Sequence, residues 1–216
     1  MIPVVEEPFA EFSSDNLLLV FLRNPVQGKV KTRIAAETSE AQALEIYEHL
    51  YAHTIRVVKQ CKVNVRWCFS DFVPENMMHE DTQIQQGNTL GERMLQAFSS
   101  ALKEYKRAVV IGSDCPYLIA EDIDVAFKSL NTHDVVFGPA IDGGYYLMGM
   151  TSIQEELFKE IDWGTDKVLR QSLDACQMLN LNFRLLKTYP DIDHYSDWIR
   201  YITTQHKTVN PSPRAY

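Results

Sequence analysis

Several features that mark common protein classes are missing from this sequence. Its 216 residues contain no apolar run near the roughly 20 residues that a membrane-spanning helix needs. None of the four cysteines lies in a C-x-x-C pair, so neither a zinc site nor a disulfide framework is indicated. Residues 1–16 are acidic, whereas a secretory signal begins basic and continues apolar. We therefore expect a cytoplasmic protein with reduced thiols and no membrane span.

Positive charge is also scarce. Lysine and arginine number 21 against 29 aspartates and glutamates, which gives a net charge of -8. A surface of that sign repels polyanions, so nucleic acid is not expected as a partner. The hydrophobic fraction of 45% and the charged fraction of 23% are typical of a globular protein. A chain of this length can form a single domain with a substantial core.

The two common phosphate-binding loops are absent as well. The sequence has no G-x-G-x-x-G, and the one candidate for G-x-x-x-x-G-K-[ST] lacks the first glycine. Residues 23–33 instead carry four cations around one glycine, namely Arg23, Gly28, Lys29, Lys31 and Arg33. A solvated basic turn is one interpretation. We favour phosphate binding, because glycine allows close backbone approach and a turn in an acidic protein needs no such density of cations.

Strand and helix patterns alternate along the chain. Apolar or alternating runs predict strands at 17–22, 63–69, 108–111, 135–137, 145–150 and 183–186. Helical spacing predicts helices at 38–60, 90–105, 121–130, 165–179 and 195–205. This alternation indicates a single α/β domain over residues 1–216, with a mostly parallel sheet, helices on both faces, a core of about 17–206 and a loose tail from Lys207.

Ligands of such sheets bind beyond the carboxyl ends of the strands, and two of those ends carry aspartates. Asp114 follows the strand at 108–111, and Asp193 follows the strand at 183–186. Each can be a helix cap. Each can also be a ligand of Mg²⁺ or Mn²⁺, and the two can converge on one ion because they lie on strand ends of the same sheet.

Two further segments have both a structural and a functional interpretation. Asp142-Gly143-Gly144 is a strong hairpin signal, or a flexible loop over the site in which Asp142 accepts a hydrogen bond or acts as a general base. Trp163 precedes a helix, as part of its start or as an aromatic platform for an acceptor. Cys115 can be a nucleophile, but a free cysteine with no histidine near it is more typical of a small buried hydrophobe.

Six segments occur in the order of one known family: residues 29–33 (KVKTR), 86–94 (QGNTLGERM), 112–116 (GSDCP), 138–146 (GPAIDGGYY), 163–165 (WGT) and 191–193 (DID). Over about residues 17–200 the chain resembles bacterial glycosyltransferases associated with radical-SAM proteins and arsenosugar biosynthesis. These belong to the nucleotide-diphospho-sugar transferase superfamily, which has the GT-A fold. The sequence departs from the usual pattern at residues 23–25, where many members have Lys-x-Pro, and at residues 114–116, where Asp-Cys-Pro replaces the usual Asp-x-Asp.

The resemblance implies a Rossmann-like sheet, a nucleotide-sugar donor and a Mg²⁺ or Mn²⁺ ion. It places the phosphate loop on Gly28, Lys31 and Arg33 and the metal on Asp114 and Asp193. From the residue patterns we also expect Arg23, Lys29, Gly91 and Arg93 to bind the nucleotide, and Asp142 and Asp114 to be the catalytic groups. We expect the acceptor, a small molecule, to contact Gly143, Gly144, Tyr145 and Trp163.

Three functions remain open on this basis. A glycosyltransferase moves a sugar from a nucleoside diphosphate to the acceptor, and we place this interpretation first. A nucleotidyltransferase releases pyrophosphate from a nucleoside triphosphate. In that respect the basic loop resembles 2-phospholactate guanylyltransferases, and the general plan resembles molybdenum cofactor guanylyltransferases. A nucleotide-binding protein without turnover is third, since carboxylates suited to a metal are unnecessary for binding alone.

Overall fold

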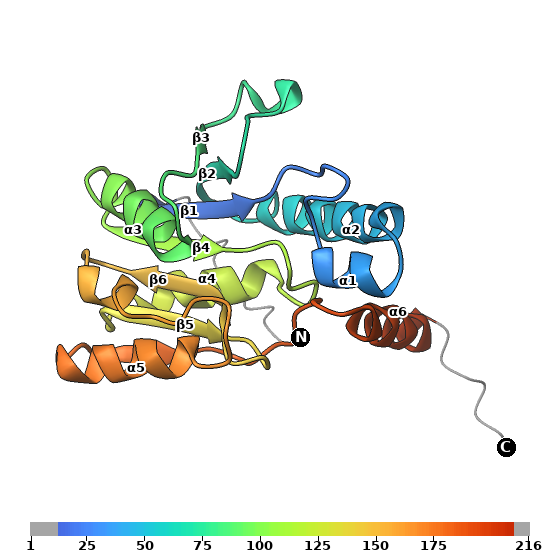
Figure 1. Ribbon diagram of the computed structural model, residues 1–216. Helices are drawn as coiled ribbons and strands as arrows, with labels where there is room; N and C mark the ends of the chain where they lie inside the picture. The colour runs from blue at the N-terminus through green and yellow to red at the C-terminus, as the bar shows by residue number, and fades with distance from the viewer. Residues whose placement is uncertain (1–12, 210–216) are drawn as a thin grey trace, which may run out of the picture.

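The computed structural model describes residues 13–209, in which seven strands form one sheet between helices (Figure 1). The strands are β1 (Ser13–Leu22), β2 (Val63–Phe69), β3 (Thr82–Ile84), β4 (Arg107–Ile111), β5 (Val135–Pro139), β6 (Tyr145–Met150) and β7 (Phe183–Leu185). The α-helices are α1 (Thr32–Glu37), α2 (Glu40–Val58), α3 (Leu90–Ala101), α4 (Ala120–Ser129), α5 (Val168–Met178) and α6 (Tyr195–Val209). Short 3-10 turns lie at Glu75–Met77 and Glu155–Phe158.

The sheet has the strand order β3-β2-β1-β4-β6-β5-β7, and only β6 runs against its neighbours. β6 follows β5 through a hairpin and lies between β5 and β4. Because β6 is reversed, its first residue lies at the edge where the other strands end. The hairpin loop of residues 140–144 therefore joins the loops that follow β1 and β4 at the carboxyl edge of the sheet. The predicted mostly parallel α/β fold is confirmed.

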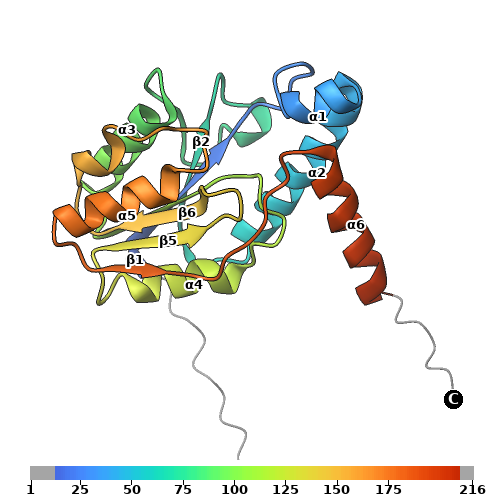
Figure 2. The same cartoon turned by 60° about the horizontal axis from the view of Figure 1, so that its bottom comes forward.

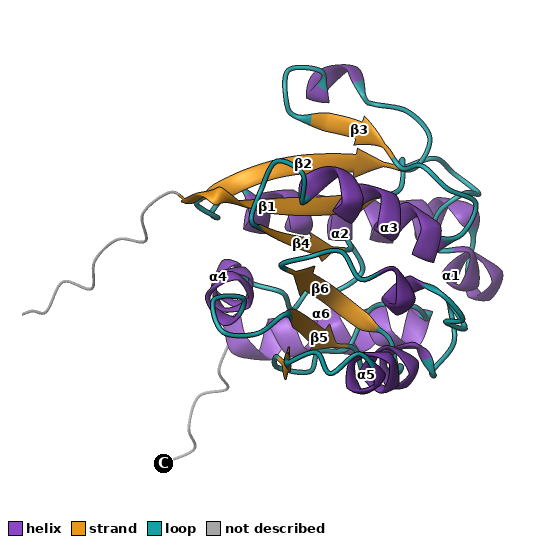
Figure 3. Cartoon of the chain, turned by 90° about the vertical axis from the view of Figure 1, so that its left-hand side faces the viewer, coloured by secondary structure: helices purple, strands orange, loops and turns teal. Residues whose placement is uncertain are grey.

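Helices cover both faces of the sheet, which explains why β1 is apolar throughout. Leu18, Val20 and Leu22 pack in one cluster with side chains of α2 and α4. Leu17 and Leu19 face the opposite cluster, which contains side chains of α3 and α5. Figure 3 shows α3 and α5 on one side of the sheet and α4 on the other. A strand buried on both faces reads as a continuous apolar run, and this burial fixes the position of the loop that follows it.

The last helix packs away from the sheet, against α2. Ile192 and Tyr201 share a small apolar cluster with Ile46 and Leu50 of α2, and Figure 2 shows α6 beside α2. This packing places the segment just before α6 near the start of α1. Within the described residues, no helix is both long enough and apolar enough to cross a lipid bilayer.

The element boundaries show where the sequence pattern is weakest. β3 and α1 were not predicted, because three residues without alternation and a single turn of helix carry little periodic signal. α3 ends at Ala101 rather than Tyr105, and α5 begins at Val168 rather than Thr165. α6 continues to Val209, so the tail predicted as loose begins within a helix, and its residues 210–216 lie outside the described part of the chain.

Candidate functional site

The basic loop leaves β1 at the carboxyl edge of the sheet and is anchored by a buried tyrosine. The hydroxyl group of Tyr47, on α2, accepts a hydrogen bond from the Arg23 backbone N–H and donates one to the Arg23 carbonyl, both at 2.9 Å. Ser113, in the loop after β4, donates to the same hydroxyl at 3.3 Å. Gly28 adopts φ +78°, which favours glycine. Tyr47 therefore links the start of the basic loop to the loop that carries Asp114.

Lys31 joins the basic loop to the acidic side of the site. Its Nζ atom lies 2.7 Å from Oδ1 of Asp114 and 3.6 Å from Oδ1 of Asp193, and it donates to the Ile192 carbonyl. The Arg33 guanidinium pairs with the other oxygen of Asp193 at 2.7 Å. The two carboxylates expected to share a metal ion therefore lie on either side of one ammonium group. The helix-cap interpretation does not account for either carboxylate by itself, because both pair with cations.

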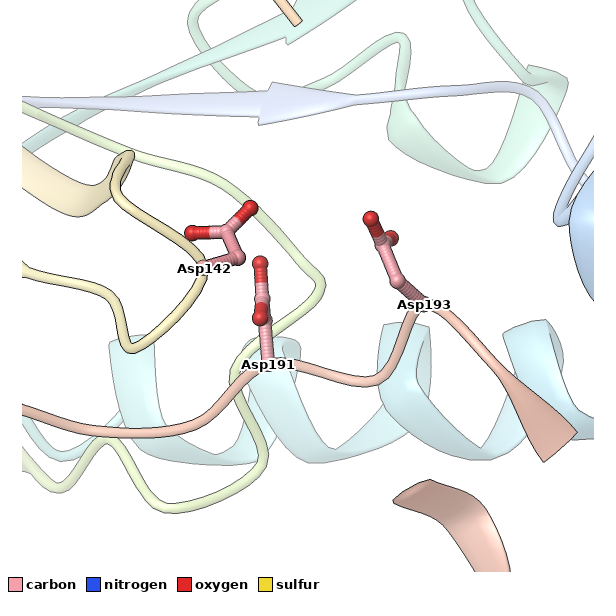
Figure 4. Close-up of side chains that lie close together, drawn as sticks. All are labelled: Asp142, Asp191 and Asp193. Carbon is pink, nitrogen blue, oxygen red and sulfur yellow. The ribbon is translucent and has the colours of Figure 1, made fainter. Parts of the chain in front are cut away.

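Three carboxylates gather beside this ion-pair network. Asp142 comes from the β5–β6 hairpin, and Asp191 and Asp193 come from the segment that leads into α6 (Figure 4). One oxygen of each lies within 4.8 Å of the others. Burial, followed by the charges of Asp142 and Asp193, raises the pKa of Asp191 from 3.8 to about 7. A divalent cation between these oxygens would relieve their mutual repulsion.

Asp142 both closes the hairpin turn and lies in the candidate site, so the two interpretations of this residue are compatible. Oδ1 of Asp142 accepts a hydrogen bond from the Gly144 N–H at 2.9 Å, which closes the turn. Gly143 has φ +92°, and a Cβ atom there would lie 2.1 Å from the Asp166 carbonyl oxygen. Glycine is therefore required at position 143 by both backbone conformation and close packing. This turn directs Asp142 toward Asp191, as Figure 4 shows.

Two adjoining cavities lie at this edge of the sheet. The larger, of about 460 Å³, runs from the ends of β1 and β4 to the start of β6 and the first turn of α3. The smaller, of about 160 Å³, is lined by Arg23, Lys29, Lys31 and Arg33 with two carboxylates. Arg23, Tyr47 and Asp114 line both cavities. The arrangement joins a space of nucleoside size to a space of high positive charge.

The remaining predicted residues lie on the wall of the larger cavity or just behind it. Arg93 and Tyr145 line this cavity, and Arg93 is oriented by a 3.0 Å hydrogen bond from its Nε to the Gly87 carbonyl. Gly91 is buried against Trp163, since a Cβ atom there would lie 2.4 Å from the indole nitrogen. Trp163 also makes an edge contact with the Tyr145 ring. Gly91 thus allows α3 to approach Trp163, and Arg93 shares the lining of the larger cavity with Arg23.

The sequence analysis did not select Asp191. A signal for it was present, because Asp191 and Asp193 flank Ile192, which is almost fully buried. Alternate residues of an extended segment point to the same side, so the pattern Asp-Ile-Asp is typical of two aspartates that face away from the core together. Cys115 is buried, and burial raises the pKa of its thiol to about 12. The thiolate is therefore strongly disfavoured, which argues against a nucleophile.

Comparison with known proteins places the chain in a defined structural group. Residues 53–165, more than half of the chain, match the model of DUF2064, a family described as uncharacterized proteins conserved in bacteria. A candidate nucleotide-diphospho-sugar transferase from Desulfovibrio desulfuricans G20 is 27% identical, with a TM-score of 0.83 over 93% of this chain and 92% of that one. No curated protein sequence matches the chain.

More distant structures share the fold. A nucleotidyl transferase from Methanothermobacter thermautotroptrophicus has a TM-score of 0.60 at 12% identity, over 91% of this chain and 100% of its own. A Mycobacterium tuberculosis H37Rv protein in complex with manganese has a TM-score of 0.55 at 12% identity, over 88% and 99% of the two chains. At this identity the likeness concerns the fold alone.

Proposed function

The chain belongs to the bacterial DUF2064 family, and from its site we propose that it is a metal-dependent glycosyltransferase that moves a sugar from a nucleoside diphosphate to a small-molecule acceptor. The observation that carries this proposal is the pair of adjoining cavities. The smaller is rich in cations and suits phosphates, and the larger has room for a nucleoside and a sugar. The likeness of the motifs to glycosyltransferases associated with radical-SAM proteins supports the same choice.

The residues present fit a hard divalent cation. The donors are all carboxylate oxygens, which Mg²⁺ and Mn²⁺ prefer. Asp193 belongs to both candidate sets, with Asp114 across Lys31 and with Asp142 and Asp191 in the group of three carboxylates. We propose Asp193 as the central ligand. Bound there, the ion would offset the negative charge that develops on the departing diphosphate.

The chain's own groups divide the remaining work. Lys31 and Arg33 hold the phosphates, because their charged donors line the smaller cavity. Arg23 contributes a further positive charge for the phosphates where the two cavities meet. Asp142, held by the hairpin on the opposite side, removes the proton of the acceptor hydroxyl as a general base. Tyr145 and Trp163 form an aromatic wall behind the acceptor.

One observation favours nucleotidyl transfer as a second candidate. Four cations, those of Arg23, Lys29, Lys31 and Arg33, line the smaller cavity. That number suits the β- and γ-phosphates of a nucleoside triphosphate, which leave as pyrophosphate. A protein that only binds nucleotides is distinguished from both candidates by the absence of turnover with any donor.

A competition experiment at fixed Mn²⁺ decides between the two reactions. We expect a nucleoside diphosphate or nucleotide sugar to bind at least as tightly as the matching triphosphate, because a third phosphate would occupy the place of the sugar. For a nucleotidyltransferase, loss of the γ-phosphate removes about two charge-assisted contacts, which weakens diphosphate binding roughly a hundredfold. A hundredfold preference for a triphosphate, with pyrophosphate released on addition of an acceptor, would establish the second candidate instead.

A further inference from the structure

Lys31 has an unusual environment for a residue of a phosphate-binding loop. Its side chain is only 7% exposed, although its neighbours Lys29 and Arg33 are exposed. The three contacts of its ammonium group are Asp114, Asp193 and the Ile192 carbonyl. Asp114 and the Ile192 carbonyl lie within hydrogen-bond distance of this group, and Asp193 adds a longer ion pair. In this state Lys31 is bound to carboxylates of its own chain.

The backbone at Lys31 is also unusual. It adopts φ 45° and ψ 49°, in the left-handed region, at the start of α1. A lysine rarely adopts this conformation, and such residues concentrate at binding and switch sites. In this conformation Lys31 lies at the N-terminus of α1, and its side chain reaches the loops after β4 and β7. The same side chain lines the smaller cavity, where it is within reach of a bound anion.

Lys31 contacts the same carboxylates that a metal ion requires. Asp114 is half exposed and Asp193 is about one-third exposed, so both are accessible to an ion from solvent. The ammonium group lies between them at 2.7 and 3.6 Å. A divalent ion that binds both carboxylates would stand close to this positive charge, which would oppose it strongly at such short range. Full coordination therefore requires Lys31 to move.

We propose that Lys31 competes with the divalent cation for Asp114 and Asp193, and that nucleotide phosphates release these carboxylates by drawing the Lys31 ammonium to themselves. This inference rests on the proposed function, since it assumes a metal-dependent nucleotide substrate. It makes metal binding weak without nucleotide and tight with it. By linkage, the metal then strengthens nucleotide binding by the same factor.

The consequence for the enzyme is an order of assembly. In the nucleotide-free protein Lys31 and Arg33 neutralise Asp114 and Asp193, so these two carboxylates hold a metal ion only weakly. Arrival of a diphosphate changes the partners of both groups at once. Arg33 supports the same exchange, because it holds the second oxygen of Asp193 from an exposed position. The metal is thereby recruited together with its substrate.

The test measures Mn²⁺ binding by isothermal titration calorimetry in wild-type protein and in Lys31→Met. Each is measured alone and with the four common ribonucleoside diphosphates in turn. Without nucleotide, we expect Lys31→Met to bind Mn²⁺ about tenfold more tightly than wild type, which is within the usual range of coupling between sites. A diphosphate should strengthen Mn²⁺ binding by wild type and have much less effect on the variant.

Lys103→Met is the matched control, because it removes the same charge from an exposed position outside the site. Among the described residues Lys103 forms no ion pair, so this variant should stay within about threefold of wild type without nucleotide. Lys31→Gln is a second variant in case the methionine disturbs folding, since its amide can still donate to the Ile192 carbonyl. Adding Asp114→Asn to Lys31→Met should remove the gain, because the released carboxylate is then absent.

The outcomes distinguish competition by Lys31 from the metal-dependent function on which it rests. Nucleotide-enhanced Mn²⁺ binding in wild type, with no gain in Lys31→Met or Lys31→Gln over Lys103→Met, overturns the competition and leaves the metal-dependent function standing. Absence of Mn²⁺ binding in wild type with every diphosphate overturns the metal-dependent function itself, and the inference with it. A gain specific to position 31, lost with Asp114→Asn, supports the proposal.

Discussion

The basic loop and the acidic group at the carboxyl edge of the sheet are built in opposite ways. The cations all come from residues 23–33, one connection after the central strand β1. The carboxylates come from three connections, after β4, within the β5–β6 hairpin and after β7. A charge cluster carried by one loop is visible in the sequence. The sequence indicated that Asp114 and Asp193 could converge, but the approach of Asp142 and Asp191 to Asp193 becomes visible only when the topology is known.

The two regions also differ in how their side chains are held in place. The basic residues lie on a loop fixed at one end by Tyr47, while the carboxylates stand on a tight turn and on a segment held by a buried isoleucine. They meet at Lys31–Asp114 and Arg33–Asp193. We infer that the acidic side is the fixed framework and that the basic side changes partner when a phosphate binds.

The largest effect is expected on the acidic side, from Asp142→Asn. Asparagine can still accept the Gly144 hydrogen bond, so the turn is retained while the base is lost. Loss of a general base typically lowers turnover by roughly 10² to 10⁴-fold, so kcat should fall at least a hundredfold with donor affinity nearly unchanged. Steady-state kinetics with the preferred donor measures both.

Asp166→Asn is the control for Asp142→Asn, because it removes an exposed carboxylate whose backbone adjoins the same hairpin. Its kcat should match that of wild type. If Asp142→Asn instead loses donor affinity and keeps its kcat, Asp142 is a donor contact, and the comparison of a phosphate side with an acceptor side is wrong.

A smaller effect is expected on the basic side, from Arg33→Ala. Arg33 is more than half exposed, so it should contribute one charge-assisted contact, worth about 1.5 kcal/mol or about tenfold in affinity. A nucleoside diphosphate should lose this factor, and the bare nucleoside should lose none. Calorimetry with both ligands makes the measurement. Equal losses for the two ligands would show that Arg33 does not bind phosphate.

The smallest effect concerns stability and pH at Asp191. Its folded-state pKa of about 7 exceeds the ordinary 3.8, so between these values the folded protein binds more protons than the unfolded chain. The contribution of Asp191 to the free energy of unfolding therefore falls as pH rises through this window. In chelator-treated buffer, Asp191→Asn should raise Tm by a few degrees near pH 8 and by distinctly less near pH 5.

Thermal melts of Asp191→Asn and Asp166→Asn at both pH values provide the measurement and its control. Asp166→Asn should show no pH-dependent difference from wild type, because its carboxylate is exposed. An equal change in Tm at both pH values for Asp191→Asn would mean that the loss of the buried charge of Asp191 is not its cause.

The sequence predicted the α/β class and most of the strands, because buried strands such as β1 and β4 are continuous apolar runs. The hairpin signal at residues 142–144 is consistent with the reversal of β6, but nothing in the sequence showed that β6 lies between β5 and β4. In the helix predicted at 38–60, helical spacing defines one apolar stripe, made of Leu44, Tyr47, Tyr51, Ile55 and Val58. It does not include Ile46 and Leu50, which are buried in the cluster shared with α6. A single apolar stripe predicts one buried face of a helix, whereas α2 is buried on two faces, one against the sheet and one against α6.

The site was predictable to the extent that its residues are neighbours in sequence. The roles of the basic loop, Asp142 and the predicted metal ligands remain predictions, although the structure brings Lys31, Asp114 and Asp193 together. The contact of Gly91 with Trp163 was not predictable, because the two residues are distant in sequence and neither carries a charge that would suggest a partner.

The position of β6 has a consequence for synthesis of the chain. β4 pairs with β1 on one side and with β6 on the other, and β6 is made only after residue 144. Until then the apolar strand β4 is an open sheet edge on a growing polypeptide, and such edges invite pairing with other chains. During synthesis β4 therefore remains an unpaired edge of the partial sheet until β6, which runs in the opposite direction, pairs with it. A fragment that stops after α4 should be far more prone to aggregate than the whole protein.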